Sequence, residues 1–338
     1  MPHSNDPRFQ DFLDEYGIPS LEMLRRFPRF IQLETVSGCN AACTMCSVSS
    51  WARTKNAMSD ELFSRIVEEI RSHVHWVEQV TLQLGGEPLL DKKLEQRVIQ
   101  LKKAGVRAVA FTSNASLLDE ARAHRILASG VDVIDFSIDG ASAATFEAIR
   151  LGLDFDSVRE NVLNFVKLRD RLGSTLRIRV RMVLQPENVH ELDAFVAYWQ
   201  KRLGPSDFVL ARFLNWWANW HEDIAAVRGK LLQQKPALDP FNHLPCLSPF
   251  STLVVLSDGR APLCCLDYNA DTPMGDVAAT SIAKVWQGPA FEGVRRQHLA
   301  NGGRQSMEFC RDCQIFVADS GLDFAGEGNA DAVGEHVS

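Results

Sequence analysis

The sequence predicts an α/β fold built on a parallel sheet. Between residues 30 and 213, short runs rich in β-branched residues alternate with amphipathic helical segments. This alternation is typical of parallel strands joined by right-handed crossovers. Periodicity alone leaves a doubly wound sheet and a partial barrel open. Cysteines directly after the first run favour the barrel, because chemistry in parallel barrels gathers at the carboxyl ends of the strands.

Six runs are predicted as strands, with helices between them. The strands are Phe30–Val36, Val77–Leu84, Val106–Thr112, Val131–Ile138, Leu176–Leu184 and Asp207–Phe213. One helix is expected to begin after Ser59, an N-cap residue that two acidic residues follow. Another is expected to end before Gly105, since glycine commonly terminates helices.

Length, charge and hydropathy limit the class of protein. The chain has 338 residues, enough for one large α/β domain and a smaller unit. Its net charge of −7 argues against nucleic acid as a partner. No apolar run approaches membrane-spanning length, and the first residues lack the features of a signal peptide. We therefore expect a cytoplasmic protein with no membrane partner, whose eight cysteines stay reduced.

Three cysteines stand close together directly after the first predicted strand. Cys39, Cys43 and Cys46 form a Cys-x3-Cys-x2-Cys run. Three thiolates in such a run can bind three irons of a [4Fe–4S] cluster and leave the fourth iron open to a small molecule. A zinc site is the alternative, although structural zinc usually takes four protein ligands and fits this run poorly.

This run resembles the signature of the radical S-adenosylmethionine (SAM) superfamily. In that family the open iron binds the amino acid end of SAM, which is cleaved reductively to methionine and a 5′-deoxyadenosyl radical. The resemblance implies an open, TIM-like (β/α)6 barrel and an electron donor of the flavodoxin or ferredoxin type. The family usually has an aromatic residue before the third cysteine, where this chain has Met45. Methionine can supply a similar apolar contact.

The same resemblance implies a SAM site after the later strands. The turn Gly85-Gly86-Glu87 matches the one that recognises the SAM amino group, and its glycines are expected to let the backbone approach a ligand closely. The remaining candidates follow the third and fourth strands: Ser113, Asn114, Ser137, Asp139 and Arg150. Of these, Asn114 and Arg150 stay open to a structural reading as helix-cap and surface residues.

A second set of cysteines occupies the C-terminal third. Its members are Cys246, Cys264, Cys310 and Cys313. Gly259 is expected in a tight turn of a β-hairpin between Leu253–Leu256 and Ala261–Cys264. Four thiolates can ligate a cluster fully, and the pattern resembles the twitch domain, the short form of the SPASM domain. No cysteine follows Cys313, so one auxiliary [4Fe–4S] cluster is expected, with a four-cysteine zinc ribbon as the alternative.

The eighth cysteine, Cys265, directly follows Cys264. Successive side chains of a strand point to opposite faces, so Cys265 is not expected to bind the same cluster. Two readings are open for it. It is a packed apolar residue, as most free cysteines are, or it donates a hydrogen atom, as in radical SAM epimerases.

The predicted organisation has five parts: an N-terminal extension at residues 1–29, the partial barrel at 30–213, an aromatic-rich connector at 214–245, the twitch domain at 246–318 and a flexible tail at 319–338. The connector contains Trp216, Trp217 and Trp220, which are expected to form an apolar seam between the domains, with at least one indole facing a substrate cavity. The tail is rich in Gly, Ala, Asp and Glu, which is typical of loose segments.

These features predict a radical SAM oxidoreductase that converts a secondary alcohol to a ketone, with the auxiliary cluster accepting an electron. Twitch-type proteins with similar cysteine spacing include dehydrogenases of aminoglycoside biosynthesis, which implies an aminocyclitol or amino sugar as substrate. Glu191 and Asp267 are candidates for binding its ammonium groups. Arg179, Arg181 and Arg212 are candidates for helping to move the proton.

Three other functions stay open. The first is a sugar epimerase in which Cys265 donates a hydrogen atom. The second is a maturase of a ribosomal peptide, although the 29 residues before the barrel are few for a peptide-recognition domain. The third is a redox scaffold without catalysis, against which the intact cysteine run and the Gly-Gly-Glu turn argue.

Overall fold

The computed structural model describes residues 7–213, 245–311, 313 and 322–325. Its main sheet has eight strands in the order β10-β6-β5-β4-β3-β2-β1-β7. Strands β1 to β6 are parallel and lie side by side in chain order. They are β1 (Phe30–Leu33), β2 (Gln79–Thr81), β3 (Ala108–Ser113), β4 (Val133–Ser137), β5 (Arg177–Leu184) and β6 (Phe208–Phe213). The six predicted strands are thus confirmed.

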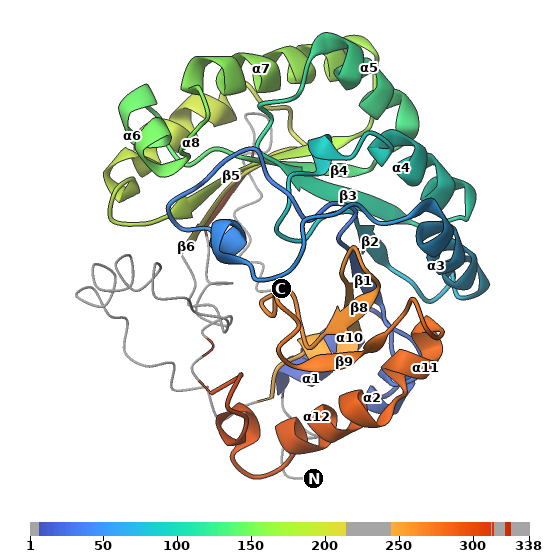
Figure 1. The fold of residues 1–338 in the computed structure, drawn as a ribbon. Helices are drawn as coiled ribbons and strands as arrows, with labels where there is room; N and C mark the ends of the chain where they lie inside the picture. Colours follow the sequence, from blue (N-terminus) through green and yellow to red (C-terminus); the bar gives the residue numbers. More distant parts are fainter. Residues whose placement is uncertain (1–6, 214–244, 312, 314–321, 326–338) are drawn as a thin grey trace.

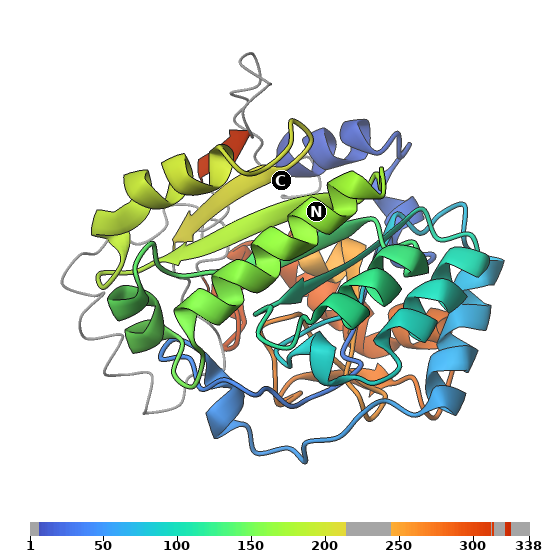
Figure 2. The ribbon, with the colours of Figure 1, turned by 90° about the horizontal axis from the view of Figure 1, so that it is seen from above.

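Six helices cover one face of this sheet, and together they form an arc around it (Figure 1, Figure 2). They are α3 (Asp60–Ser72), α4 (Leu94–Lys103), α5 (Glu120–Ser129), α6 (Ala143–Ile149), α7 (Phe155–Arg171) and α8 (Leu192–Gln200). The Ser59 side chain caps α3 by accepting a hydrogen bond from the Leu62 amide. Gly105 follows the end of α4 with φ +91°, as expected of a helix-terminating glycine. The predicted α/β partial barrel is confirmed.

The strands divide their side chains between two faces. Apolar residues such as Ile178, Val180 and Met182 of β5 belong to one core with Val162 and Phe165 of α7. The alternate residues lie on the opposite face, which we call the inner face. It is mostly polar and half-buried, and includes Gln32, Gln79, Thr81, Gln83, Thr112, Asp135, Ser137, Arg179, Arg181 and Arg212.

The C-terminal segment joins the barrel sheet. It contains α10 (Ser248–Ser251), β7 (Thr252–Val255), β8 (Arg260–Pro262), β9 (Pro273–Asp276), α11 (Ile282–Trp286) and α12 (Pro289–Leu299). The predicted turn forms, since Gly259 has φ +95° and the Leu256 amide donates to the Arg260 carbonyl at 2.9 Å. The strand pairing differs from the predicted hairpin: β7 pairs in parallel with β1, whereas β8 pairs antiparallel with β9.

The N-terminal helices α1 (Pro7–Glu15) and α2 (Leu21–Leu24) pack against the C-terminal segment. Phe9 meets Phe250 edge to face at 4.9 Å between ring centroids, and the Trp286 indole donates to the Leu24 carbonyl at 2.8 Å. Tyr16 packs on Phe30 at the start of β1. This end of the sheet is therefore covered, and the predicted site residues lie at the opposite, carboxyl ends of the strands.

One part of the predicted flexible tail is ordered. β10 (Leu322–Ala325) pairs antiparallel with β6, and the Gln200 side chain donates to the Ala325 carbonyl at 2.8 Å. Hydrogen bonds to the edge strand β6 order these residues, although the Gly, Ala, Asp and Glu content of the tail is typical of loose segments. Trp216, Trp217 and Trp220 of the connector lie outside the described residues. Among the described helices, none is both long and apolar enough to span a membrane.

Candidate functional site

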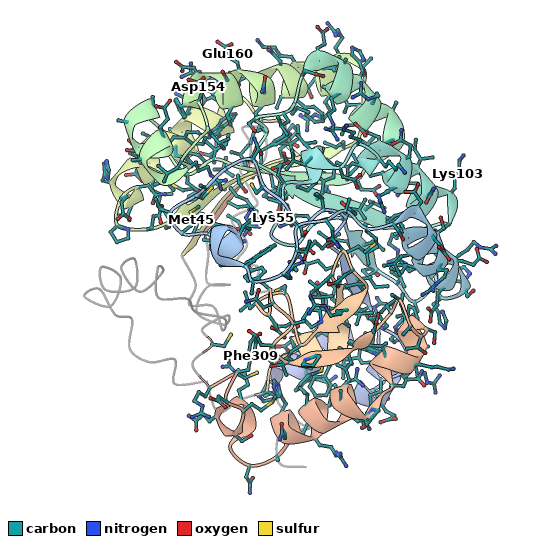
Figure 3. All side chains as sticks on the ribbon, viewed as in Figure 1. Met45, Lys55, Lys103, Asp154, Glu160 and Phe309 are labelled. Atoms are coloured by element: carbon teal, nitrogen blue, oxygen red, sulfur yellow. The ribbon has the colours of Figure 1, made fainter. Side chains whose placement is uncertain are left out.

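Cys39, Cys43 and Cys46 lie in the loop between β1 and α3, and all three are partly buried. Burial raises the pKa of each thiol, most of all for Cys46, where burial with a smaller contribution from Cys43 and Cys39 raises the pKa to about 12. The preceding Met45 is buried in the interior (Figure 3). Three neighbouring, shielded thiols are a suitable donor set for an iron–sulfur cluster, which binds thiolates.

Two polar side chains reach this loop from later strands. Asn114, just after β3, places its amide nitrogen 3.0 Å from the Asn40 side chain and 3.9 Å from the Cys39 sulfur. Arg150, just after α6, places a guanidinium nitrogen 3.8 Å from the Cys43 sulfur. Both side chains are buried, so the reading of Arg150 as a surface residue is wrong. Asn114 also caps its own turn by accepting from the Ser116 amide.

Glu87 is the central carboxylate of this region. Its side chain is buried and accepts hydrogen bonds from the Leu89 amide, the Ser113 hydroxyl and the Asn114 amide, at 2.8–2.9 Å. Burial raises the pKa of Glu87, and these hydrogen bonds oppose that rise. The structure thus brings Glu87, Ser113 and Asn114 together, within contact of the cysteine loop.

The two glycines before Glu87 are required by close contacts within the protein. A Cβ on Gly86 would lie 2.1 Å from the Val36 carbonyl oxygen, and one on Gly85 would lie 2.3 Å from the Trp51 ring. The Glu87 amide donates to the Gly38 carbonyl at 2.8 Å. The glycines therefore let the turn dock directly on the backbone before Cys39 and on Trp51, so they shape the site from within the protein.

Asp139 and Arg150 form a buried ion pair at 2.7 Å after β4. Burial opposes the charge on Arg150, but Asp139 and Cys43 outweigh it and the arginine pKa is raised. Asp139 also accepts from the Val183 amide at 2.7 Å, which fixes its position. Ser137, two residues earlier, is half-buried on the inner face.

The second cysteine set converges from three separate segments. Burial raises the pKa of Cys310 to about 12, and the neighbouring Cys246 and Cys313 contribute. Cys264 has a strongly raised pKa from burial, and the same two cysteines lie close to it. Four converging thiols fit a fully ligated cluster. Among the described residues, no three His, Cys, Asp or Glu side chains are close enough to hold a single metal ion.

Buried basic residues surround this second set. The His298 ring accepts from the Cys246 amide at 3.1 Å, and Arg304 donates to the Cys313 carbonyl at 3.0 Å. Phe309, which precedes Cys310, packs against the main hydrophobic core that also contains β5 and α7 (Figure 3).

An aromatic pair lies between the two cysteine sets. The rings of Trp51 and Tyr268 stack with centroids 5.2 Å apart. Burial raises the pKa of Tyr268 well above its usual value, and the neighbours that add to this include Cys46 from the first set and Cys264 from the second. No sequence pattern predicts this pair, because the two residues are far apart in the chain and no motif includes them.

Cys264 and Cys265 lie in a bend and a turn after β8, not in the strand that the sequence predicted, and their side chains join different clusters. Cys264 packs against the main core, whereas Cys265 belongs to a small apolar cluster with Trp51, Tyr268, Cys39 and Cys46. It therefore faces the first cysteine set.

The two acidic residues expected to bind ammonium groups have structural roles instead. The Glu191 carboxylate accepts from Ser142, Thr145 and the Ala141 amide at the start of α6. Asp267 is fully buried and accepts from three backbone amides of its own loop. Their assignment to substrate binding is corrected accordingly.

Glu191→Gln is expected to lower stability at neutral pH and to weaken its dependence on pH. Burial opposes the charge on Glu191, but the hydrogen bonds from Ser142 and its neighbours dominate and lower the carboxyl pKa. The stabilisation is therefore present above the unfolded-state pKa and is lost as the pH falls through the folded-state value. We expect a loss of about 1 kcal/mol at pH 7 that shrinks toward pH 4. Urea unfolding across this range measures it, and a difference independent of pH would contradict it.

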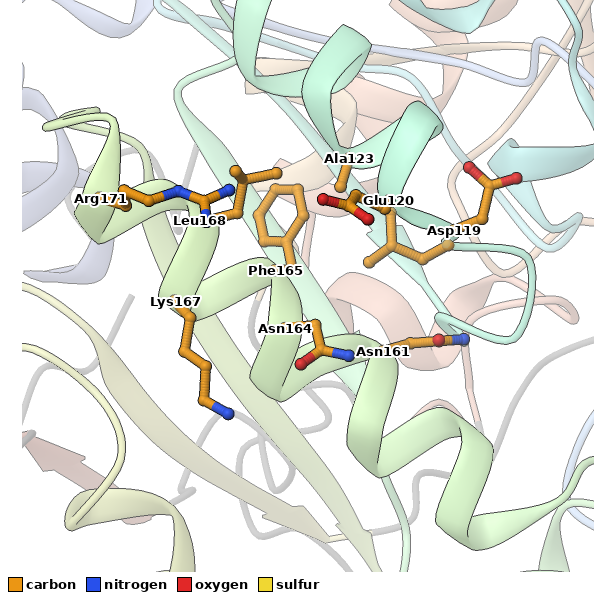
Figure 4. A pocket seen from close by; sticks show the side chains of 10 residues that line it. Asp119, Glu120, Ala123, Asn161, Asn164, Phe165, Lys167, Leu168 and Arg171 are labelled. Atoms are coloured by element: carbon orange, nitrogen blue, oxygen red, sulfur yellow. The ribbon is translucent and has the colours of Figure 1, made fainter.

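A separate hollow of about 310 Å³ lies between α5 and α7, on the outer side of the sheet (Figure 4). Asp119, Asn161, Asn164 and Lys167 are among its lining residues. None of the predicted site residues lines it.

Comparison with known proteins agrees with this arrangement. The radical SAM superfamily model matches residues 33–198, and the SPASM iron–sulfur cluster-binding domain matches residues 246–314. The tungsten-containing aldehyde ferredoxin oxidoreductase cofactor-modifying protein of Pyrococcus furiosus is 28% identical over 174 residues, which are 50% of this chain and 48% of that protein. GTP 3′,8-cyclase of a Synechococcus species is 35% identical over 138 residues, 39% of this chain and 36% of its own. The chain spans about half the length of these relatives or less.

Solved structures share the fold. BtrN in complex with AdoMet and 2-DOIA superposes with a TM-score of 0.55 at 19% identity, covering 85% of this chain and 92% of BtrN. SuiB of Streptococcus suis bound to S-adenosylmethionine superposes with a TM-score of 0.63 at 14% identity, covering 91% of this chain and 78% of SuiB. A radical SAM domain implies SAM and a [4Fe–4S] cluster as cofactors, and a SPASM domain implies further iron–sulfur ligation. Residues 33–198 of this chain thus form a radical SAM domain, and residues 246–314 form a SPASM domain.

Proposed function

We propose that this enzyme oxidises a secondary alcohol of a sugar-like substrate, of the aminocyclitol or amino sugar class, to a ketone. The substrate carbinol loses one hydrogen atom, then one electron and one proton. When bound, SAM and its cluster supply the radical that takes the hydrogen atom, and an auxiliary cluster supplies the one-electron acceptor. A flavodoxin or ferredoxin is the proposed electron donor to the first cluster.

The residues proposed to hold SAM and its cluster are those that meet around the first cysteine loop. Cys39, Cys43 and Cys46 provide the iron ligands. Glu87 has buried carboxylate oxygens suited to an ammonium group, and its neighbouring donors hold it in place. Arg150 is suited to a carboxylate, although Asp139 shares it. The Gly85-Gly86 turn fixes Glu87 against the cysteine loop.

The observation that carries the proposal is the short protein path between the two cysteine sets. Tyr268 shares an apolar cluster with Cys46, and Cys46 and Cys264 are both near enough to raise its pKa. A cluster held by Cys246, Cys264, Cys310 and Cys313 has no open iron, so it is suited to accept an electron rather than to bind a substrate. An electron acceptor next to the radical-generating site favours oxidation of the substrate.

The polar inner face supports a polyhydroxylated substrate. Amide and hydroxyl side chains such as Gln79, Thr81 and Thr112 lie there, half-buried, at positions where a packed barrel would carry apolar residues. The structural neighbour BtrN was solved with 2-DOIA, and the GTP 3′,8-cyclase relative takes its name from GTP. Both likenesses favour a small polar molecule as the substrate.

A sugar epimerase is the second candidate, and the position of Cys265 favours it. This thiol shares an apolar cluster with Cys39 and Cys46 and thus faces the first site. A thiol there is placed to return a hydrogen atom to the substrate carbon.

Turnover in heavy water separates the two functions. Oxidation is expected to yield a ketone with no carbon-bound deuterium at the reacting centre, and Cys265→Ala is expected to keep this activity. Mass spectrometry of the product measures both. An isomer one mass unit heavier, absent with Cys265→Ala, would establish the epimerase instead.

Glu87→Ala is expected to weaken SAM binding by about 1.5–3 kcal/mol, because a buried ammonium group loses its charged acceptor. Anaerobic calorimetry with SAM measures this loss. Ser113→Ala serves as the matched control, since it removes a hydrogen bond to Glu87 but keeps the carboxylate. Equal SAM affinity for the Glu87→Ala and native proteins would show that SAM lies elsewhere.

A further inference from the structure

We infer that the substrate carries an anionic group, a phosphoryl or a carboxylate, and that Arg181 binds this group on the inner face. The inference rests on the proposed function and adds an anionic group to its sugar-like substrate.

The strand register places Arg181 near the proposed SAM site. Ile178, Val180 and Met182 of β5 face the helices, so Arg179 and Arg181 lie on the inner face. Arg181 pairs in register with Ser137 of β4. Asp139 of the buried ion pair follows two residues later, which is about 7 Å along an extended chain.

Guanidinium groups outnumber carboxylates on this part of the inner face. Arg179 forms a two-point ion pair with Asp135, and Arg212 pairs with Asp323 of β10. Arg181 reaches only the Asp135 oxygen that Arg179 already contacts, at 3.6 Å. Arg179 and Arg181 thus share the one carboxylate of Asp135.

Arg181 retains donors for a ligand. Its side chain is 35% exposed, and in the described part of the chain this ion pair is its one side-chain contact to a charged group. A guanidinium has five N–H donors and binds phosphate and carboxylate oxygens in pairs. It also stays charged at any physiological pH, so anion binding suits it better than the proton transfer first considered for it.

In the part of the chain that the structure describes, the acidic groups near the inner face have partners. Asp135 and Asp323 pair with arginines, and Glu34 is buried against Arg53 with its oxygens engaged. Together with the structural roles of Glu191 and Asp267, this leaves no described carboxylate that faces the site without a partner. Beside Arg181 the described side chains thus carry net positive charge, which attracts an oxyanion.

Calorimetry on the anaerobically reconstituted enzyme with SAM tests this inference. The probes are glucose, glucosamine, glucose 6-phosphate and glucuronate, which differ in charge on one sugar frame. At least one of the two anions is expected to bind tenfold or more tightly than glucose and glucosamine. The stronger anion distinguishes a phosphoryl from a carboxylate site.

Variants on β5 assign the effect. Arg181→Gln is expected to abolish the preference for the anion, and Arg181→Lys to restore part of it. Arg177→Gln is the matched control, because Arg177 lies exposed on the same face at the start of the strand. Circular dichroism and iron content show that each variant is folded and loaded.

Three results would overturn the inference: tightest binding of glucosamine, no binding of either anion, or anion preference that survives Arg181→Gln. Because binding is measured without turnover, absence of ketone formation would leave this result intact and count against the proposed function alone.

Discussion

Replacing Cys39, Cys43 and Cys46 together by alanine is expected to remove about four of about eight irons and to abolish formation of 5′-deoxyadenosine. The three thiols are the only candidate ligands on the loop that Glu87, Asn114 and Arg150 contact, so their loss leaves no donor set for the cluster at that position. Iron and sulfide analysis after anaerobic reconstitution measures the first effect, and chromatography of the SAM products measures the second.

The second cysteine set provides the matched control. Alanine at Cys246, Cys264, Cys310 and Cys313 is also expected to remove about four irons. This variant should still form 5′-deoxyadenosine but no ketone, because the electron acceptor is absent. Stoichiometric zinc in the native protein in place of the second set of irons would refute the oxidation mechanism.

Gly86→Ala is expected to destabilise the fold strongly. The added Cβ would lie 2.1 Å from the Val36 oxygen and 2.9 Å from the Gly38 oxygen, and both are backbone atoms that cannot move independently. The turn or the cysteine loop must therefore shift. We expect a loss of about 3 kcal/mol in the free energy of unfolding, together with poor retention of the first cluster.

Denaturant unfolding and iron analysis measure these effects. Gly293→Ala is the control, because Gly293 lies in α12 and a Cβ there meets no atom within 4 Å. Its stability should stay equal or rise by about 1 kcal/mol, as helix propensity predicts. If Gly86→Ala had the same unfolding midpoint in denaturant as the native protein, the turn would not dock on this backbone.

Local patterns were sufficient to predict the parallel sheet. Each central strand is a short β-branched run with one face against a helix, and such runs appear as separate peaks of hydrophobicity. The parallel sheet also predicts that the site residues lie together, since residues that follow parallel strands meet at one edge of the sheet. Glu87, Ser113, Asn114, Asp139 and Arg150 therefore lie together.

Contacts between distant segments were beyond the reach of these patterns. β7 pairs with β1 although more than 200 residues separate them, and a hairpin was the simplest reading of the local turn. β10 forms in a polar, glycine-rich segment because the open edge of β6 offers hydrogen-bond partners. The roles of Glu191 and Asp267 depend on which amides the fold brings to them.

The pairing of β7 with β1 has a mechanical consequence. β1 leads directly into Cys39, and β7 leads through the Gly259 turn and β8 to Cys264. Adjacent strands lie about 4.8 Å apart, so a hydrogen-bonded ladder, and not a tether, sets the separation of the two iron sites. Electron tunnelling depends steeply on such a separation. The ladder therefore ties the positions of the two cysteine sets to each other, because neither strand can slide without breaking hydrogen bonds.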